Sequence, residues 1–254
     1  MADSLHLDKD ASEYRESMAK IKETFNSTFW TGSACRHPNY KGKTDDRCQA
    51  LAIVSGIAEK EKYPALLEVF KAEEHASPYM EKYVLEALFQ MDYVDFAIKR
   101  MKKRFGDMVN NPNYTTLFEG WGIGKKGYGG GTSNHAWSGG ALTILSQYLC
   151  GIEPLEPGYS LFQIIPKTGS IQKAAASVQS VKGIIKSNFE REDAKLKLAV
   201  SVPPGTEAIV GIPDDDNDIS QIKLNSETIW KNGKLIQSKS IKELLAYFMN
   251  KNGS

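Results

Sequence analysis

Apolar residues recur at helical spacing over roughly the first 150 of the 254 residues of this chain. The clearest stripe lies along residues 10–29 and consists of Tyr14, Met18, Ile21, Phe25 and Phe29. It predicts an amphipathic helix of about five turns. Asp10 followed by Glu13 matches a capping box, in which the two side chains satisfy free backbone N–H groups, so we expect the helix to begin there.

Three more helices are predicted between residues 47 and 90. One covers residues 47–58, and two begin with a proline at the first helical position, Pro64 and Pro78, where a missing N–H costs nothing. Ser77 is the N-cap candidate of the last. The side chains expected to face inward are Ala50, Leu51, Val54 and Ile57, then Leu66, Leu67 and Phe70, then Met80, Val84, Leu85 and Leu88.

Two further helices and two long loops complete this half. One helix covers residues 92–105 and ends at Gly106; the other starts after residue 133 or 134 and ends at Gly151, a typical left-handed residue after a helix. The connections at 31–45 and 106–133 exceed the usual loop length, which is common at functional sites. If successive helices form antiparallel hairpins, both loops emerge from the same end of the bundle.

After Gly151 the apolar period falls to two residues. Strands are predicted at 159–166, 195–203 and 206–213, and residues 229–236 predict a hairpin that turns at Asn232-Gly233. Residues 240–250 have the pattern of a final helix.

The order of helices followed by strands predicts an α+β protein of two domains rather than a βαβ fold. We expect a helical domain at residues 1–151 and an antiparallel β-sandwich with a terminal helix at residues 152–254. The segment 151–158, rich in Pro and Gly, is the expected linker.

Composition narrows the classes of function. With 32 basic and 31 acidic side chains the formal charge is +1, which gives no field to steer the chain towards nucleic acid or an anionic membrane. No apolar run approaches the roughly 18 residues of a membrane span, so we expect a soluble chain; its compartment stays open, because an excised piece would lack a signal peptide. Cys35, Cys48 and Cys150 show neither a disulfide framework nor zinc-ligand spacing.

Two motifs are rejected on their context. Residues 122–127 match the glycine pattern of a dinucleotide site, but the following helix begins near residue 134 and no βαβ unit surrounds the motif. In the acidic run 214–227, Ile219 stands where a calcium loop needs glycine and Asn225 where it needs glutamate. We therefore expect no cofactor and no bound metal.

Glu119 has the neighbours that a sugar site needs. It lies between Phe118 and Trp121, and the same region carries His135 and Trp137. Aromatic faces stack on sugar C–H groups, polar groups bind hydroxyls, and a carboxylate serves as acid or base. Spacing alone also fits an alternative in which the tryptophans pack the end of the bundle, His135 caps a helix and Glu119 is merely exposed.

Three blocks of sequence carry a family resemblance: TTLFEGW (115–121), SNHAWSGG (133–140) and YLCGIEPLEPGYSLFQIIPK (148–167). In this order they resemble the α-L-rhamnosidases of glycoside hydrolase family 78, in which an (α/α)6 barrel is followed by a C-terminal β-sandwich. The resemblance runs from the first helix to about Pro213. It implies a glycosidase that acts on rhamnose-containing oligosaccharides or glycosides.

The resemblance also implies roles for individual residues. Glu119 falls on the glutamate proposed as catalytic base in the family, and His135 falls on a histidine that lines the rhamnose pocket in relatives. Trp121 and Trp137 are expected as stacking or wall residues of the same pocket.

The chain departs from the family in two respects. The block of the type Asp-Cys-Pro-x-Arg-x-Glu-Arg that holds the general acid has no counterpart, and Asp45-Asp46-Arg47 echoes it only superficially. Six predicted helices are also half of the twelve that close an (α/α)6 toroid. We therefore expect a C-terminal fragment of a larger rhamnosidase, or a degenerate homologue, that is inactive alone and exposes apolar helix faces through which it can self-associate.

Three alternatives remain open from the sequence. The chain could be a non-catalytic carbohydrate-binding homologue, or a structural module in which the glycines only allow close packing. It could also belong to another class of α-toroid glycosidase or lyase, with Asp45 or Asp46 as the partner acid of Glu119.

Overall fold

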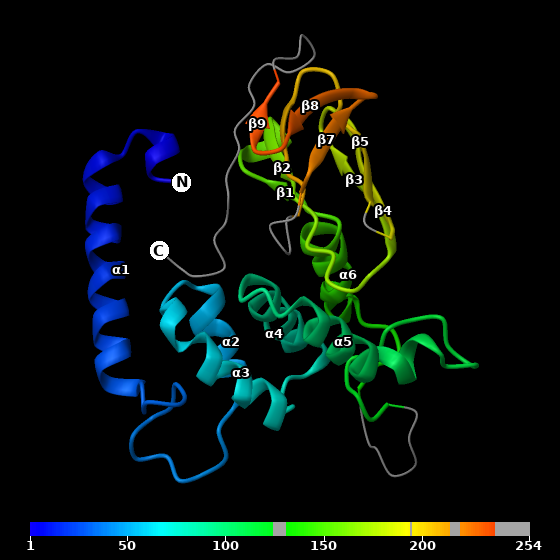
Figure 1. The fold of residues 1–254 in the computed structure, drawn as a ribbon. Helices are drawn as coiled ribbons and strands as arrows, with labels where there is room; N and C mark the ends of the chain where they lie inside the picture. The colour runs from blue at the N-terminus through cyan, green and yellow to red at the C-terminus, as the bar shows by residue number, and fades with distance from the viewer. Residues whose placement is uncertain (124–130, 194, 214–218, 237–254) are drawn as a thin grey trace. The chain divides into compact units, whose positions relative to one another are not determined.

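The computed structural model describes residues 1–123, 131–193, 195–213 and 219–236 (Figure 1). Contacts divide the chain into two compact units, Met1–Val210 and Gly211–Ser254. Among the helices of the described ranges, none has both the length and the apolar character that a membrane span requires. The helix predicted at 240–250, the acidic residues 214–218 and two glycines of the 122–127 motif lie outside the described residues.

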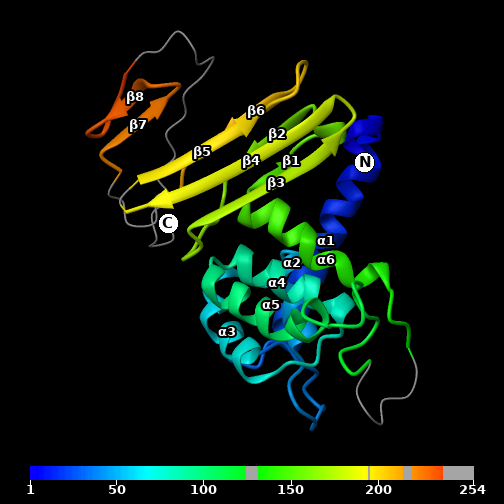
Figure 2. The same ribbon diagram turned by 90° about the vertical axis from the view of Figure 1, so that its right-hand side faces the viewer.

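The described part of Met1–Val210 begins with helices. The α-helices are α1 (Asp8–Phe29), α2 (Asp46–Val54), α3 (Tyr63–Ala72), α4 (Pro78–Gln90), α5 (Val94–Val109) and α6 (Gly140–Ile144). Short helical turns are η1 (Asp3–Leu5), η2 (Lys60–Lys62), η3 (Ala136–Gly139), η4 (Leu145–Leu149) and η5 (Pro157–Tyr159). The centre is α4, which packs against α2, α5 and α6 (Figure 2). Val84, Leu85 and Leu88 of α4 are fully buried, as predicted.

Local chemistry accounts for the start of α4 and for the late end of α5. The Ser77 hydroxyl accepts the N–H of Met80 at 3.3 Å, and Pro78 occupies the first turn, so the predicted N-cap is confirmed. The predicted stop at Gly106 is wrong, because α5 continues to Val109. Burial of Met108 offsets the roughly 1 kcal/mol cost of a glycine inside a helix.

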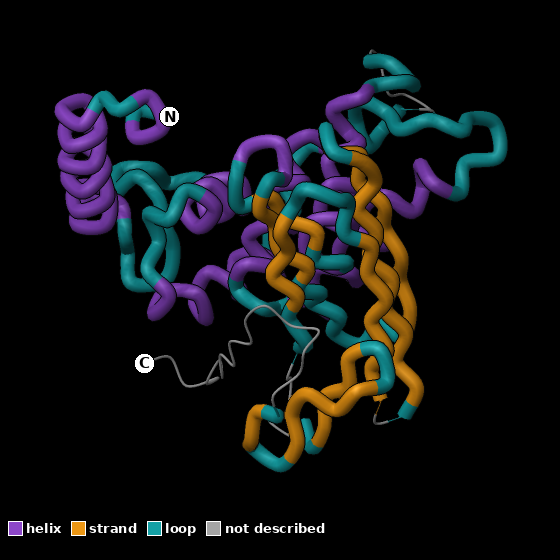
Figure 3. The backbone as a smooth tube through the Cα atoms, turned by 90° about the horizontal axis from the view of Figure 1, so that it is seen from above, coloured by secondary structure: helices purple, strands orange, loops and turns teal. Residues whose placement is uncertain are grey.

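The first helix differs from its prediction at its start and along its apolar stripe. It begins at Asp8 after Leu7, with no side-chain cap, so the capping box at Asp10 does not form. Much of the stripe is open to solvent: the exposed fractions are 67% for Tyr14, 64% for Met18 and 58% for Ile21. Figures 1 and 3 show α1 to one side of the other helices.

The inward face of α2 is also rotated relative to the prediction. Leu51 is 46% exposed, whereas Ala52 and Ile53 are buried. Asp46 and Gln49 are buried on this helix too, where Asp46 accepts from Arg100 and Gln49 bonds to the Cys35 backbone.

Three small sheets follow the helices. Their strands are β1 (Ile152–Pro154), β2 (Leu161–Ile164), β3 (Lys173–Ser180), β4 (Gly183–Glu192), β5 (Lys195–Ser201), β6 (Glu207–Val210), β7 (Gln221–Leu224), β8 (Glu227–Lys231) and β9 (Lys234–Leu235). The orders are β1-β2-β6, β3-β4-β5 and, in the second unit, β7-β8-β9. The pair β2 and β6 is parallel, whereas the sequence predicts antiparallel pairing throughout.

The sheet β3-β4-β5 shares a core with the helices. Phe189 of β4 is completely buried in the helical cluster, where Ala174, Leu196 and Leu198 also pack. The Ser187 hydroxyl donates to the Cys150 carbonyl at 2.7 Å. A smaller core joins β1, β2 and β4 through Ile152, Phe162, Ile164 and Ile185. The domain boundary at residue 151 stays a prediction.

Two turns have the backbone that the sequence predicts. Gly151 has φ of +76°, and a Cβ there would lie 2.3 Å from the Ile165 carbonyl carbon, so only glycine fits. In the second unit Asn232 and Gly233 have φ of +48° and +78°, as a type I′ turn requires between β8 and β9.

Candidate functional site

Two segments far apart along the loop lie side by side and hold the site. The Glu119 N–H donates to the Thr132 carbonyl at 3.0 Å, and the His135 N–H donates to the Leu117 carbonyl at 2.9 Å. Both segments precede α6, and the Ser138 hydroxyl fastens the second to the first through the Phe118 carbonyl at 2.6 Å. These bonds bring Glu119 and His135, which the sequence predicts as parts of one pocket, to the same place.

Thr132 connects the two side chains. Its backbone N–H donates to Oε2 of Glu119 at 2.9 Å, and its Oγ1 lies 3.2 Å from the same oxygen and 3.0 Å from Nδ1 of His135. The direct distance from His135 Nδ1 to Glu119 Oε2 is 3.8 Å. About a third of each side chain is exposed, 35% for Glu119 and 34% for His135, so water and small solutes can reach both.

Gly131 gives the backbone before Thr132 its direction. Its φ is +87°, a value that L side chains rarely adopt, and a Cβ there would lie 2.9 Å from Cδ1 of Ile123. The turn at Gly131 aims the next N–H, that of Thr132, at the carboxylate.

Aromatic rings continue from His135 across the surface. The centroid of Trp137, in η3, lies 4.2 Å from that of His135 and 5.3 Å from that of Tyr79, in the first turn of α4. Tyr83 follows one turn later, 5.9 Å from Tyr79. Trp137 is 42% exposed and Tyr79 40%, so their faces are available to a ligand.

Trp121 lies in a different environment from the other predicted site residues. Its Nε1–H donates to the Ala76 carbonyl at 2.7 Å, its ring meets Phe105 edge to face at 5.0 Å, and the Arg104 guanidinium lies 4.4 Å from the ring centre. The structure therefore places Trp121 against the helical core and not with the group formed by Glu119, His135 and Trp137.

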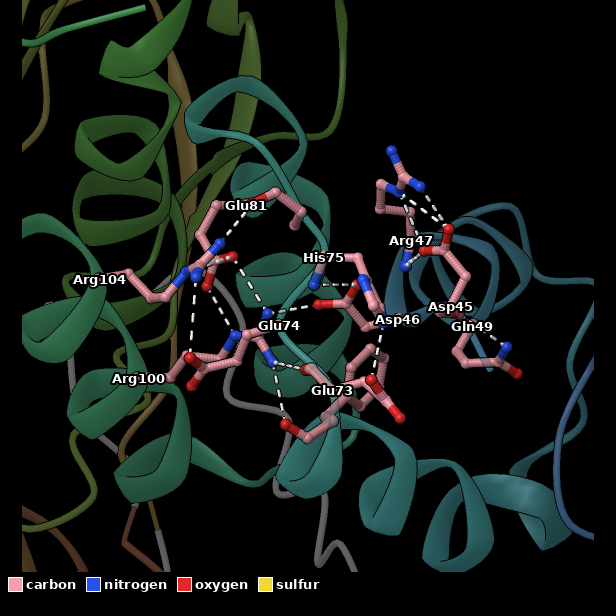
Figure 4. Close-up of polar contacts among 12 residues, drawn as sticks. Asp45, Asp46, Arg47, Gln49, Glu73, Glu74, His75, Glu81, Arg100 and Arg104 are labelled. Atoms are coloured by element: carbon pink, nitrogen blue, oxygen red, sulfur yellow. Dashed lines mark hydrogen bonds and ion pairs between the residues drawn. The ribbon is translucent and has the colours of Figure 1, made fainter. Parts of the chain in front are cut away.

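A second carboxylate cluster lies at the junction of α2, α4 and α5 (Figure 4). Asp46 Oδ2 accepts from Arg100 Nη2 at 2.5 Å, and its Oδ1 accepts the His75 backbone N–H at 3.0 Å. Glu81 accepts from Arg100 Nε at 2.6 Å and from Nη2 at 3.1 Å. The side chains of Asp46 and Glu81 are 0% exposed, so a substrate cannot reach them.

Asp45 is closer to solvent but has a structural role. It caps α2 by accepting the Arg47 N–H at 2.9 Å, and the Arg47 guanidinium binds the same carboxylate (Figure 4). The hydrogen bond from the Arg47 side chain is the main reason that the pKa of Asp45 is lowered. A carboxyl held ionised in this way is a poor general acid, because an acid must carry a proton at the working pH.

No metal centre forms among the residues that the structure describes: no three or more His, Cys, Asp or Glu side chains gather there in a way that could hold an ion.

Sequence reasoning missed Thr132 and Tyr79. The importance of Thr132 depends on the backbone pairing of 117–119 with 132–135, and that of Tyr79 on the packing of η3 and α6 against α4. The one sequence signal for Thr132 is its place directly before the block SNHAWSGG, which begins at Ser133.

Solved structures of α-L-rhamnosidases have the same fold. The match to the α-L-rhamnosidase from Dictyoglumus thermophilum covers 94% of this chain and 28% of the rhamnosidase chain, with a TM-score of 0.77 and 22% identity. The match to the Streptomyces avermitilis enzyme, complexed with L-rhamnose, covers 89% of this chain and 24% of the enzyme's chain, with a TM-score of 0.70 and 21% identity. At these identities the likeness shows the fold, which is part of a six-hairpin glycosidase followed by small sheets.

Sequence models place the chain in a family. The bacterial alpha-L-rhamnosidase 6 hairpin glycosidase domain matches residues 1–149, and the bacterial alpha-L-rhamnosidase C-terminal domain matches residues 151–227. The chain therefore belongs to the α-L-rhamnosidases of glycoside hydrolase family 78. The predicted family and the predicted α+β class, helices followed by sheets, are both confirmed.

The curated relatives are much longer than this chain. An α-L-rhamnosidase of Formosa agariphila is 30% identical over 138 residues, which cover 52% of this chain and 15% of the relative. One of Streptomyces avermitilis is 24% identical over 227 residues, which cover 84% of this chain and 22% of the relative. The matched part of the chain thus covers less than a quarter of the length of each.

Proposed function

We propose that this chain supplies the general-base side of an inverting α-L-rhamnosidase site that hydrolyses terminal α-L-rhamnosyl linkages, with Glu119 as the base. One observation carries the proposal: a carboxylate that is about one-third exposed is held by Thr132 beside His135, on a wall that continues to an exposed tryptophan. Family membership supplies the class of reaction.

The geometry suits a base that activates water. In an inverting glycosidase one carboxylate removes a proton from water, while a second carboxyl, roughly 6.5 to 9.5 Å away, protonates the leaving oxygen. Both hydrogen-bond donors of Thr132 meet Oε2 of Glu119. Oε1 has no hydrogen-bond partner among the described residues, so it is the oxygen to which a water can bind.

Asp45 and Asp46 do not provide the acid in this proposal. Asp46 is 0% exposed and bound to Arg100, and Asp45 is kept ionised by Arg47. This removes the support for another class of glycosidase built on these two carboxylates. We therefore expect this chain alone to hydrolyse no rhamnoside.

The sugar is proposed to lie against His135 and Trp137, with Tyr79 extending the wall. The ring of Trp137 provides an apolar face and His135 a polar edge 4.2 Å away, which matches a ligand that has both C–H and hydroxyl surfaces. The relative from Streptomyces avermitilis that was complexed with L-rhamnose supports a rhamnosyl ligand.

Binding can be tested by NMR titration of the chain with L-rhamnose, with D-mannose as the control sugar. We expect L-rhamnose to shift the Trp137 indole signal and the Thr132 amide, and to leave the Trp30 indole unmoved, because Trp30 packs at the end of α1. No response to L-rhamnose at Trp137 and Thr132 would contradict the proposed site.

Catalysis can be tested with an aryl α-L-rhamnoside. We expect no turnover by this chain. Turnover that Glu119→Gln abolishes would support the base but overturn the inference that the acid is missing; turnover that survives Glu119→Gln would overturn the role of Glu119.

A further inference from the structure

Among the residues that the structure describes, Thr132 is the one whose side chain lies within hydrogen-bond distance of both Glu119 and His135. Its Oγ1 lies 3.2 Å from Glu119 Oε2 and 3.0 Å from His135 Nδ1, whereas these two atoms are 3.8 Å apart and make no direct hydrogen bond. The relation between the carboxylate and the imidazole therefore depends on the one proton that the hydroxyl carries.

The available donors and acceptors determine the direction of each hydrogen bond between Glu119, Thr132 and His135. An ionised carboxylate can only accept hydrogen bonds, so the Thr132 hydroxyl must donate to Glu119 Oε2. The hydroxyl has no second proton, so it can only accept from His135 Nδ1. In the opposite arrangement, with Oγ1 donating to Nδ1, two lone pairs would face each other at 3.2 Å. The favoured order puts the imidazole proton on Nδ1.

We propose that Thr132 is a positioning residue that sets His135 in the tautomer with its proton on Nδ1, so that Nε2 accepts a hydrogen bond from a sugar hydroxyl. The bond that one ring nitrogen makes decides which nitrogen is protonated. The choice of ligand, a rhamnosyl hydroxyl, rests on the proposed function; the choice of tautomer rests only on the contacts of Thr132.

Backbone bonds make Thr132 suitable for this role. Its N–H donates to the carboxylate of Glu119 and its carbonyl accepts the N–H of Glu119, so the two residues are joined on both sides. The His135 N–H is bound to Leu117. The three side chains thus project from a paired backbone, and the hydroxyl can be removed without releasing the carboxylate.

The tautomer can be read directly by long-range ¹H–¹⁵N NMR of the full chain with labelled histidines. There are four histidines, and the set that disappears in His135→Gln belongs to residue 135. We expect the pattern of an Nδ1–H imidazole at neutral pH. Thr132→Ser, which keeps the hydroxyl, should retain this pattern, and Thr132→Val, which keeps the shape and the backbone N–H, should lose it.

Two results would overturn the assignment of the tautomer. One is a His135 proton on Nε2 in the unsubstituted protein. This measurement does not depend on whether any variant folds. The other is an unchanged pattern in Thr132→Val, which would show that another contact holds the ring.

The ligand is tested by adding L-rhamnose to the same samples. We expect the Nε2 signal to move, and Thr132→Val to bind L-rhamnose roughly two- to tenfold more weakly, as loss of one ordered hydrogen bond predicts. Rhamnose that shifts Trp137 but leaves Nε2 unmoved would overturn the acceptor role of His135. If no site residue responds to the sugar, the proposed function fails, while the tautomer is still decided by the spectrum without ligand.

Discussion

The protein contains two carboxylate clusters that differ in almost every physical respect. In the cluster of Asp46, Glu81 and Arg100, the three side chains are 0%, 0% and 2% exposed, and each carboxylate oxygen accepts a hydrogen bond (Figure 4). In the cluster around Glu119, about a third of the carboxylate side chain is exposed and its two described donors belong to Thr132. Burial closes the first cluster to a ligand, whereas the second is open to solvent and to a ligand.

Charge compensation explains why the buried cluster is stable. Burial alone lowers the pKa of Arg100, but hydrogen bonds and charge from Glu81, and then from Asp46, outweigh burial and raise it. Arg100 also donates to the carbonyls of Phe70 and Glu73, at 2.9 and 3.1 Å. The comparison teaches that the number of partners and the exposure of a carboxylate, and not its residue type, separate a structural carboxylate from a candidate base.

The largest expected effect is the loss of Arg100. Arg100→Met removes the cation that the buried Asp46 and Glu81 share and leaves Glu81 only its 3.5 Å ion pair with Arg104, so we expect the free energy of unfolding to fall by about 3–5 kcal/mol. Urea unfolding measures it. The control is Lys103→Met, which removes the exposed pair with Glu74 and should cost less than about 1 kcal/mol. Equal losses in the two variants would contradict the structural role of the buried cluster.

Substitutions of Trp121 and Trp137 should also differ in their effect on the free energy of unfolding. Trp121→Phe removes the hydrogen bond to Ala76 and weakens the stacking of Arg104, for a loss of about 1–2 kcal/mol. Trp137→Phe should change stability by less than about 0.5 kcal/mol, because the ring is 42% exposed. Thermal and urea unfolding of both variants test this. A larger loss of stability in Trp137→Phe than in Trp121→Phe would contradict the structural role of Trp121.

Low pH should destabilise the fold in part by protonating carboxyls such as Asp45, the neighbour of the buried Asp46. The bond from Arg47 lowers the Asp45 pKa below its ordinary value of 3.8. The folded chain therefore binds this proton less readily than the unfolded chain, so the contribution is present above about pH 4 and is lost as pH falls through the folded pKa. Asp45→Asn keeps an N-cap but cannot ionise. We expect the acid-induced fall in the free energy of unfolding to be smaller in this variant by less than about 1 kcal/mol, because the Asp45–Arg47 pair is partly exposed. Urea unfolding from pH 6 downwards compares the two proteins; superimposable acid limbs would exclude this role of Asp45.

The smallest effect on stability is expected at the candidate base. Glu119→Gln keeps an oxygen that can accept the Thr132 N–H, so the free energy of unfolding should change by less than about 0.5 kcal/mol. The response of the Trp137 indole to L-rhamnose should weaken in the same variant. A stability loss close to that of Arg100→Met would place Glu119 with the structural carboxylates.

The helical half was the more predictable part of the fold. Pro78 after Ser77 marks a helix start by local chemistry alone, and the buried face of α4 follows its apolar period. The stripe of α1 has the same period, but whether its residues are buried depends on what packs against them, which periodicity does not contain.

Strands β3 and β4 were missed for an identifiable reason. Their inward positions include Ala174 and Ala176, small residues that do not mark a strand, and the hydroxyl of Ser187, which is buried because it bonds Cys150. Local pattern cannot show that a serine is inward when its partner is far along the chain.

The site divides in the same manner. Glu119 and His135 could be proposed from the sequence because their blocks resemble a family, whereas Thr132 and Tyr79 become visible only through the pairing of distant segments.

The parallel pairing of β2 with β6 sets an order of assembly. The meander β3-β4-β5 lies between these strands in the chain and pairs near neighbours, so it can form quickly. Leu161–Ile164 and Glu207–Val210 must wait until the ends of the whole intervening segment meet, which carries the larger closure entropy. The short strand β6 is therefore expected to be the last to dock during folding and, in hydrogen exchange of the native protein, among the first to open.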